Sequence, residues 1–532
     1  MKRWVCVLLM AGVTIAFGQT WYIETVDSGG AALNDVGQYT SLAIDDGNFP
    51  HITYYDVTNQ LLKYATWNGD GWEIEYVDST TPPGMIGEYT SLALSPANQE
   101  PQIGYYDADQ GHLKWAVHKP AGWEYGIPDP STNDVGRGLD IVIGTDDYPH
   151  FSYYDATAFY LMYARSLGGT WNRDTVDTVG NPADFCSSIL LDGSGIPHIA
   201  YYVNEGGTGY LKYAHLVSGN WVIDTVELRA GEDVGLYPDL ILASNGAPYI
   251  SYFDRTNGYF KYARWANGQW NIDIIDNATN VGAWGNQVLG STYVSYYDGV
   301  NMDVKYGYTS DYLSWHTESV DGPDDVGEYT SIALSKKGEI NFPHISYYDA
   351  TNGDLKYATK ILKDVEPTVI VEPRDTVYFD TSYTPRVTIV NNGNAPVACD
   401  VNFEIKHGPS GILRYSQIYA MPSLGVNEET ELTYSTDWTV GDSGCWYYIT
   451  VETLLPDDSV PDNDLLLDSV WSKGGGAVSE DIISPVVYKL DVSGTNIELA
   501  LPKTISGELY VLDVTGSRRF TIAEGDFKLG MH

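Results

Sequence analysis

Residues 325–335 read DVGEYTSIALS, and residues 342–360 read FPHISYYDATNGDLKYATK. Both stretches recur along the chain, and each copy is marked by a Tyr-Tyr-Asp triplet or a close variant of it. The seven copies end at Asp56, Asp107, Asp155, Val203, Asp254, Asp298 and Asp349, with spacings of 51, 48, 48, 51, 44 and 51 residues. A fixed period of about 40–50 residues is typical of repeat architectures, so it predicts the fold before any single residue is interpreted.

Each copy carries the pattern of short antiparallel strands. In the copy quoted above, residues 329–334, 343–348 and 355–359 are three apolar and aromatic runs. The segment Asp349-Ala-Thr-Asn-Gly353 between two of these runs is typical of a hairpin turn. A fourth strand begins with Trp in the other copies, as in GWEIEYVD at 71–78. Four antiparallel strands repeated at this period predict the blades of a β-propeller.

Along the chain, the Trp-led strands are shifted by one repeat relative to the other three strands of each repeat. They begin at Trp21, Trp72, Trp123, Trp171, Trp221, Trp270 and Trp315. The first precedes any complete unit, and the last unit lacks such a strand, so Trp21–Asp27 is predicted to supply the outer strand of the seventh blade. This pairing would join the two ends of the domain and remove an open sheet edge. The sequence therefore predicts a closed seven-bladed propeller over residues 19–363.

Composition and charge agree with an all-β protein outside the cytoplasm. Tyr (43) and Gly (54) are abundant, and 29 basic against 71 acidic residues leave a net charge of −42. This acidity argues against a nucleic-acid partner, because phosphates need Lys and Arg. Residues 1–18, with Lys2, Arg3 and an apolar run, are predicted to be a signal peptide. No later segment is apolar enough to cross a membrane, so we expect an extracellular or cell-surface protein without a transmembrane span.

The pattern changes after the repeats, where residues 364–472 alternate like the strands of a sandwich. Asn391-Asn392-Gly393 and Asp462-Asn463-Asp464 make this segment resemble immunoglobulin-like modules of the CARDB type, which are usually spacers.

Residues 473–477 are predicted to be a Gly-rich linker. In residues 478–532, Leu501-Pro502-Lys503 and the run Tyr510 to Gly516 resemble the type IX secretion sorting domain and the hook-capping β-sandwich. The final strands of those families are missing, so we expect a partial β domain.

The start of the first strand in each repeat is the candidate ligand site. First strands line the channel of a propeller, and the pattern Asp-Val-Gly-x-Tyr-Thr-Ser places the x position and the following residue at the channel mouth. These positions vary between repeats and are often aromatic, whereas a ring of Ser, Asp and Asn lies two residues further in. Such a surface could stack on sugars or hold a peptide terminus, although blade packing also explains the aromatics. The candidate ligand-binding residues are Gln38, Tyr39, Glu88, Tyr89, Arg137, Asp140, Phe185, Tyr237, Asp239, Trp284, Glu328 and Tyr329.

The repeated Asp and His residues are interpreted as structural. An Asp at the end of each second strand suits an Asx turn, and seven-fold placement spreads the equivalents around a ring. The Pro-His residues His51, His150, His198 and His344 alternate with Gln and Tyr, as packing positions do. We expect no metal site and no cofactor, with Ca²⁺ the one ion left open by the acidity of the chain. Cys399 and Cys445 fall in one domain and could form a disulfide.

Enzyme signatures are weak in this sequence. No nucleophile elbow, phosphate loop or metalloprotease helix is present, and no catalytic residue is predicted. Asp140 and Asp239 could form a glycosidase pair, but a sequence does not measure their separation. The expected function is non-catalytic recognition or adhesion, with an extracellular polysaccharide or protein as partner. A glycoside hydrolase or lyase that uses channel-mouth carboxylates, and a structural surface component, remain the alternatives.

Overall fold

A computed structural model of the chain describes residues 21–474 apart from short gaps. The gaps are 31–33, 79–83, 181–183, 289–291, 312–313, 338–339, 409, 457 and 460–462, and beyond residue 474 only strand backbone between 491 and 531 is described. The chain divides into two compact units, Met1–Lys360 and Ile361–His532. The predicted signal peptide and most of the predicted linker lie outside the described residues.

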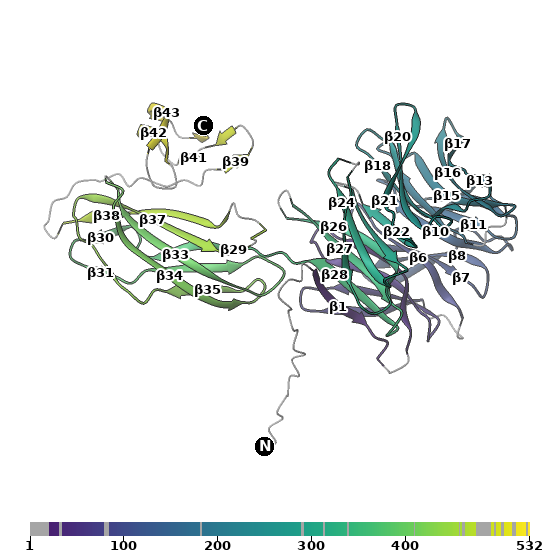
Figure 1. The fold of residues 1–532 in the computed structure, drawn as a ribbon, viewed down its shortest axis with the longest axis horizontal. Helices are drawn as coiled ribbons and strands as arrows, with labels where there is room; N and C mark the ends of the chain where they lie inside the picture. Colours follow the sequence, from purple (N-terminus) through teal and green to yellow (C-terminus); the bar gives the residue numbers. More distant parts are fainter. Residues whose placement is uncertain are drawn as a thin grey trace, which may run out of the picture. The chain divides into compact units, whose positions relative to one another are not determined.

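The first unit consists of seven four-stranded antiparallel sheets, which form the blades (Figure 1). Blades 1 to 3 consist of β2 (Val36–Ile44), β3 (Pro50–Asp56), β4 (Leu61–Trp67), β5 (Trp72–Asp78); β6 (Ile86–Leu94), β7 (Pro101–Asp107), β8 (His112–Lys119), β9 (Gly122–Gly126); and β10 (Val135–Ile143), β11 (Pro149–Asp155), β12 (Tyr160–Leu167), β13 (Thr170–Thr178). Blades 4 and 5 consist of β14 (Ser187–Leu191), β15 (Pro197–Glu205), β16 (Thr208–Val217), β17 (Asn220–Glu227); and β18 (Val234–Leu242), β19 (Pro248–Asp254), β20 (Tyr259–Ala266), β21 (Gln269–Asp276). Blade 6 consists of β22 (Val281–Val288), β23 (Thr292–Asp298), β24 (Asp303–Thr309) and β25 (His316–Asp321).

The seventh blade joins the two ends of the unit. It consists of β26 (Val326–Lys337), β27 (Ile340–Asp349), β28 (Asp354–Lys360) and, as its outer strand, β1 (Trp21–Asp27). The pairing of β1 with β28 runs from Trp21 opposite Lys360 to Asp27 opposite Leu355. The buried indole of Trp21 donates a hydrogen bond to Glu318 of blade 6, with 2.9 Å between the atoms. The predicted seven-bladed propeller, closed by the N-terminal strand, is confirmed.

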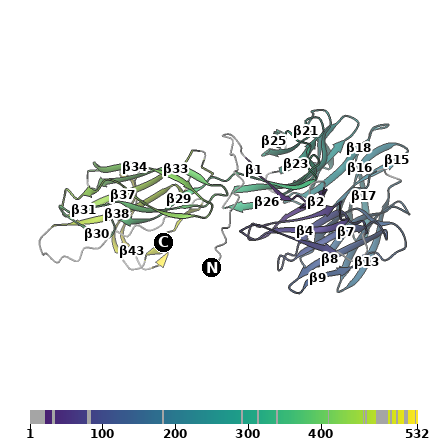
Figure 2. The same cartoon turned by 90° about the horizontal axis from the view of Figure 1, so that it is seen from below.

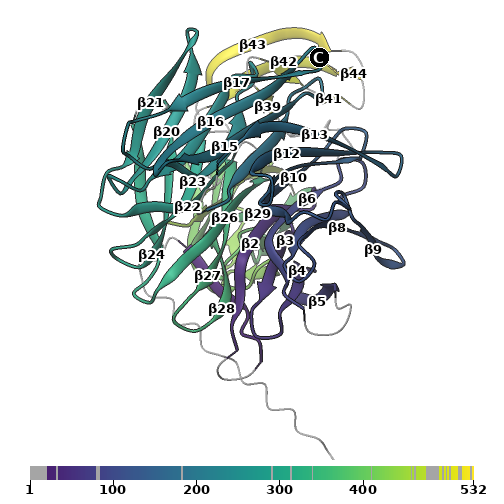
Figure 3. The same cartoon turned by 90° about the vertical axis from the view of Figure 1, so that its right-hand side faces the viewer.

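The inner strands of the blades lie around a common centre. Figure 3 shows β2, β6, β10, β22 and β26 gathered there, with β5, β9 and β28 toward the rim. Residues from the first strands of all seven blades line one cavity at the centre, as the sequence predicts.

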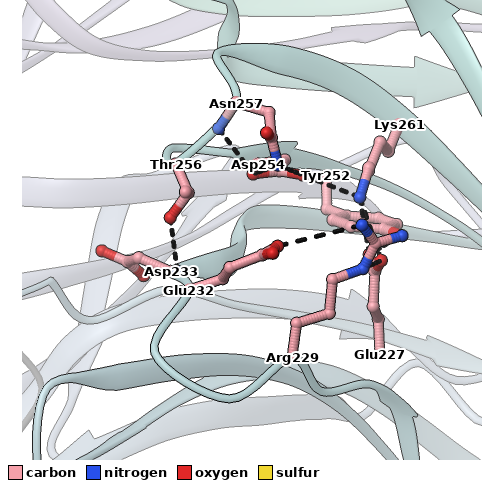
Figure 4. Close-up of polar contacts among 9 residues, drawn as sticks. All are labelled: Glu227, Arg229, Glu232, Asp233, Tyr252, Asp254, Thr256, Asn257 and Lys261. Carbon is pink, nitrogen blue, oxygen red and sulfur yellow. Dashed lines mark hydrogen bonds and ion pairs between the residues drawn. The ribbon is translucent and has the colours of Figure 1, made fainter.

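A buried polar contact joins each blade to the next. In all seven blades, the first Tyr of the triplet donates to an acid at or just beyond the end of the preceding outer strand. In blade 5, Tyr252 donates to Glu227 at 2.5 Å, and Lys261 lies between Glu227 and Asp254 at 2.9 and 2.7 Å (Figure 4). Burial alone would raise the pKa of Asp254, but the hydrogen bonds from Lys261 and Asn257 hold it below its ordinary value. The triplet therefore links neighbouring blades.

The Asp of the triplet also begins a turn, as predicted. In blade 5 its carboxylate accepts a hydrogen bond from the backbone N–H of Asn257 at 3.0 Å, and Asp56, Asp298 and Asp349 accept the equivalent N–H in their blades. These are Asx turns, in which a short acid bonds its own backbone a few residues on. The recurrence of the triplet Asp is thus explained by the scaffold.

The second unit is a β-sandwich (Figure 2). One sheet has the order β29 (Val365–Glu372), β32 (Arg386–Asn391), β35 (Glu429–Thr433), and the other β30 (Thr376–Tyr378), β38 (Leu465–Lys473), β37 (Cys445–Leu454), β33 (Val397–His407), β34 (Leu413–Leu424). The short strands β31 (Ser382–Tyr383) and β36 (Trp438–Thr439) pair with each other. Alternate residues of β33, among them Val401, Phe403 and Ile405, are fully buried in the shared core, as a half-buried strand requires.

The sandwich does not contain the disulfide that the sequence allowed. Cys399 and Cys445 are both free. They lie on the paired antiparallel strands β33 and β37, whose register runs from Asp400 opposite Leu454 to His407 opposite Tyr447. The two cysteines therefore lie at opposite ends of the pair, about 32–34 Å apart at the usual rise per strand residue. The two cysteines share a domain but do not meet, because the antiparallel direction of β33 and β37 places them at opposite ends of the strand pair.

Only strand pairing is described in the C-terminal segment. The pairs are β39 (Asp491–Ser493) with β40 (Asn496–Glu498), β41 (Ala500–Leu501) with β44 (Gly530–Met531), and β42 (Ile505–Leu512) with β43 (Arg518–Phe527). Among all described residues, there is no helix of the length and apolarity that a membrane crossing needs.

Candidate ligand site at the channel mouth

An irregularity in the first strand of six of the seven blades aims one residue toward the channel. In blade 1, the pairing of β2 with β3 shifts between Gln38 and Ser41, and Tyr39 between them has a φ of 53°. Tyr89, Tyr237, Trp284 and Tyr329 have the same left-handed conformation, with φ between 48° and 54°. Bulky residues rarely adopt this conformation, which costs about 1–3 kcal/mol each. Every repeat that has an aromatic residue here bears this cost.

These five residues form an aromatic collar of half-buried rings on consecutive blades. The ring centroids of Tyr89 and Tyr39 are 5.1 Å apart, and those of Tyr39 and Tyr329 are 4.6 Å apart. The chain of contacts continues from Tyr329 to Trp284 at 5.2 Å and from Trp284 to Tyr237 at 5.5 Å. The collar thus covers blades 5, 6, 7, 1 and 2 without a break.

Blades 3 and 4 interrupt the collar with small residues. Gly138 of blade 3 has a φ of 54°, and a Cβ there would lie 2.4 Å from the carbonyl oxygen of Phe185. Only glycine fits this position, because the chain of blade 4 approaches it closely. Cys186 stands at the collar position of blade 4, where burial raises the pKa of its thiol to about 12. A thiol held in its protonated form is a poor nucleophile.

A polar belt lies two residues beyond the collar and links all seven blades. At each position a side-chain oxygen accepts the backbone N–H of the following blade. The seven pairs are Ser331 with Leu42, Ser41 with Leu92, Ser91 with Ile141, Asp140 with Ile189, Ser188 with Leu240, Asp239 with Gln287, and Asn286 with Ile332. The belt therefore completes a ring of hydrogen bonds around the channel. Serine, aspartate and asparagine are interchangeable in it, because each offers an oxygen acceptor.

Asp140 and Asp239 are the two ionisable members of the belt. Burial raises the pKa of Asp140, although hydrogen bonds from Ile189, Ser91 and Ile141 oppose the shift. Burial, with a contribution from the nearby charge of Asp140, raises the pKa of Asp239 to about 7. Both carboxylates line the channel and are half-buried, and the surrounding blades remove much of their solvation. Loss of solvation disfavours their charged forms.

Collar and belt enclose a cavity of about 230 Å³ at the channel mouth. Eight of the twelve predicted site residues line it: Tyr39, Tyr89, Asp140, Phe185, Tyr237, Asp239, Trp284 and Tyr329. Four do not, namely Gln38, Glu88, Arg137 and Glu328. These four occupy the x position, which the strand irregularity turns away from the channel. Phe185 also holds an x position, yet β14 begins only at Ser187, so blade 4 lacks the regular strand that turns the others away.

The cavity also contains residues that the sequence did not single out as binding residues. Cys186, Leu139 and the Thr residues that follow the collar, Thr40, Thr90 and Thr330, line it as well. The threonine hydroxyls bond within the scaffold, as Thr40 does with Ser346 at 2.6 Å. Their signal in the sequence was the repeated Tyr-Thr-Ser step, in which the collar and belt residues flank a threonine.

The Pro-His residues do not line this cavity, and each links two neighbouring strands within its own blade. His150 contacts the hydroxyl of Tyr163 on the neighbouring strand at 2.6 Å, and His51, His198 and His344 make the same contact with Tyr64, Tyr213 and Tyr357. Burial is the main cause that lowers the pKa of His150 and His344 to about 4. Within the described residues, no group of three or more His, Cys, Asp or Glu side chains is arranged to hold a metal ion.

The topology defines an all-β protein with a closed seven-bladed propeller and a β-sandwich. No family model and no curated protein matches the chain. Among solved structures, it is similar to AofleA from Arthrobotrys oligospora, with 15% identity over 56% of this chain and 89% of that one and a TM-score of 0.37. It is also similar to an ulvan lyase from a new family of polysaccharide lyases (13% identity, 62% and 95% covered, TM-score 0.41).

A further solved structure is similar to a smaller part of the chain. This is the CARDB domain of a Pyrococcus furiosus protein in complex with di-metal ions, with 20% identity over 21% of this chain and 87% of that one and a TM-score of 0.16. Likenesses of this strength carry no argument about activity or ligand.

Proposed function

We propose that this protein is a non-catalytic binding or adhesion protein of the cell surface or extracellular space, and that its channel mouth recognises a carbohydrate or protein ligand. The observation that carries the proposal is the open cavity of about 230 Å³ with an aromatic collar above a polar belt. Concave sites with aromatic walls and a few placed polar groups are the usual form of ligand sites. A purely structural propeller would be expected to fill this space with side chains.

The collar residues suit the recognition of a flat, partly apolar group such as a sugar ring. Aromatic rings offer large apolar contact area, and Tyr and Trp add a polar atom that can bond a hydroxyl. The strained backbone of Tyr39, Tyr89, Tyr237, Trp284 and Tyr329 supports a role beyond packing, since such outliers concentrate at ligand sites. The sandwich of the second unit would act as a spacer, and the signal peptide would direct secretion.

One observation favours the alternative of a polysaccharide hydrolase or lyase. Asp239, with a pKa raised to about 7 by burial and by Asp140, has the proton affinity of a general acid. Against this alternative, both carboxylates already accept backbone N–H groups of the next blade, Ile189 at 2.8 Å and Gln287 at 2.5 Å. A group that holds the scaffold in this way is poorly placed to move during a reaction, so we prefer recognition.

A glycan and peptide array tests the proposal. The full chain should bind a defined set of ligands, and Trp284→Ala should lose most of that binding because it removes one wall of the cavity. Trp67→Ala is the matched control, since Trp67 is a half-buried indole at the end of β4 that does not line the cavity. Equal binding by the wild type and Trp284→Ala would overturn the proposed site, and turnover of an array glycan that Asp239→Asn abolishes would favour the enzyme.

A further inference from the structure

The cavity at the channel mouth contains two carboxyl groups and no basic side chain among its lining residues. Asp140 and Asp239 are its only ionisable acids, and no Lys, Arg or His lines it. Buried carboxylates in proteins are normally paired with a cation. Elsewhere in this propeller they are, as Lys261 shows between Glu227 and Asp254. The belt carboxylates receive only neutral donors, namely N–H groups, Asn286 and serine hydroxyls.

The nearest basic residues lie beside the cavity wall, where Arg137 lies 5.7 Å from the ring centroid of Phe185 and Arg255 contacts Tyr237, but both also pair with acids outside the cavity. Arg137 contacts Asp134 at 2.9 Å, and Arg255 contacts Asp184 at 2.5 Å and Asp233 at 3.1 Å. Each guanidinium thus has at least one carboxylate of its own, and neither residue lines the cavity. The charge of Asp140 and Asp239 is left for something that enters the channel.

The collar adds a second feature that favours positive charge. Its ring centroids are spaced 4.6–5.5 Å apart on five of seven positions around the channel. On a seven-fold circle, this spacing places each centroid about 6 Å from the centre, the distance within which a cation is attracted to an aromatic ring. A group shifted from the centre toward Tyr39 and Tyr329 would come closer to several rings at once.

We propose that the channel mouth selects a ligand by an organic ammonium group, which would enter the aromatic collar with its charge toward Asp140 and Asp239. This inference rests on the proposed function and names the chemistry of its ligand. A metal ion fits less well, because five aromatic side chains provide no oxygen cage and the carboxylate oxygens already accept N–H groups. Aromatic cages for alkylated ammonium ions combine the same two features, rings and acids.

The first experiment compares a cation with a neutral molecule of the same shape. Binding of choline and of its uncharged analogue 3,3-dimethylbutan-1-ol to the full chain would be measured by calorimetry at pH 8. Choline should bind about tenfold more tightly, because the analogue keeps the shape and loses the charge. Trp284→Ala and Asp239→Asn should each weaken choline binding several-fold, whereas Trp67→Ala should leave it unchanged. Asn at position 239 is compatible with the belt, since Asn286 fills the equivalent place in blade 6.

The second experiment asks which kind of molecule carries the ammonium group. Chitosan tetramer would be compared with its N-acetylated form, and a lysine-containing peptide with its acetylated form. Preference for either free amine supports the proposal and identifies the source. Equal binding of choline and the neutral analogue, or choline binding that survives both Trp284→Ala and Asp239→Asn, would overturn it. Binding of a neutral glycan that only Trp284→Ala abolishes would overturn the ammonium inference and leave the proposed function standing.

Discussion

The carboxylate of Asp239 accepts a hydrogen bond from the side-chain amide of Asn286, its counterpart on the next blade, at 3.0 Å. An acid and an amide therefore occupy equivalent positions in the polar belt and bond each other. Asn286 in turn accepts the N–H of Ile332 at 2.8 Å, as Asp239 accepts that of Gln287. Because the amide performs the belt's structural role, the charge of Asp239 is not needed for the scaffold.

This relationship predicts how Asp239→Asn changes stability with pH. The folded-state pKa of Asp239, about 7, lies above its ordinary value of 3.8, so the folded state binds the proton more tightly than the unfolded state. The wild type should therefore lose stability from this group as pH rises from about 4 to 7, an effect on the order of 2 kcal/mol after allowance for water in the channel. Because Asn does not ionise, the Asp239→Asn variant should not lose this stability as the pH rises.

The measurement is the melting temperature of both proteins between pH 4.5 and 8. The two should agree at pH 4.5, and Asp239→Asn should melt about 3 °C higher at pH 8. Asp70→Asn, at an exposed turn, serves as the control and should follow the wild type. A difference that is constant with pH would show that Asp239 does not titrate as described.

Removal of the N-terminal strand should open the ring. Deletion of residues 21–27 exposes the edge of β28 and removes the buried Trp21, so the melting temperature should fall by about 10 °C or more. Trp21→Ala is the milder variant and should cost about 3–5 kcal/mol by cavity formation. If the deletion melts like the full chain by near-ultraviolet circular dichroism, the pairing of β1 with β28 does not hold the ring closed.

The buried lysines between blades should differ in how much they contribute to the free energy of unfolding. Lys261→Met would remove the ion-pair partner that the described residues give Asp254 and leave Glu227 paired with Arg229 alone at 2.8 Å, and we expect a loss of about 3–5 kcal/mol. Lys212→Met should cost less, because Asp177 is the one acid that Lys212 pairs with among the described residues and Val203 replaces the second acid. Denaturant unfolding of the two variants measures the difference. A larger loss for Lys212→Met would contradict the account of the inter-blade contact.

The cysteines should all be free in the purified protein. Alkylation after denaturation without a reductant, followed by mass spectrometry, should modify Cys186, Cys399 and Cys445. Reductant should change neither the number of modified thiols nor the melting temperature. A peptide that contains both Cys399 and Cys445 in disulfide linkage would contradict the strand register of the sandwich.

The propeller could be predicted from the sequence because its signals are local and repeated. Seven copies of the triplet marked the second strands, and the displaced Trp21 strand implied closure without any knowledge of contacts. The sandwich followed from alternation of apolar residues, but the relation of Cys399 to Cys445 did not. That relation depends on which ends of β33 and β37 meet, which no local pattern contains.

The candidate site was predicted in part for a similar reason. The collar residues were found because they vary while their neighbours repeat. Glu88, Arg137 and Glu328 were also expected in the cavity, yet the strand irregularity turns their position outward and gives the next residue a positive φ. Aromatic residues rarely adopt that conformation, so a sequence gives no reason to expect it. The inter-blade hydrogen bonds of Asp140 and Asp239 were missed because they join residues about 50 positions apart.

The central claim is that the aromatic cavity at the channel mouth binds the ligand of this protein. The most direct test is the affinity of the wild type, Trp284→Ala and Trp67→Ala for the strongest array ligand, measured side by side on folded proteins. The account predicts that Trp284→Ala loses about tenfold or more in affinity, as expected for an aromatic anchor, while Trp67→Ala binds like the wild type. Unchanged affinity of Trp284→Ala, or equal losses in both variants, would contradict it.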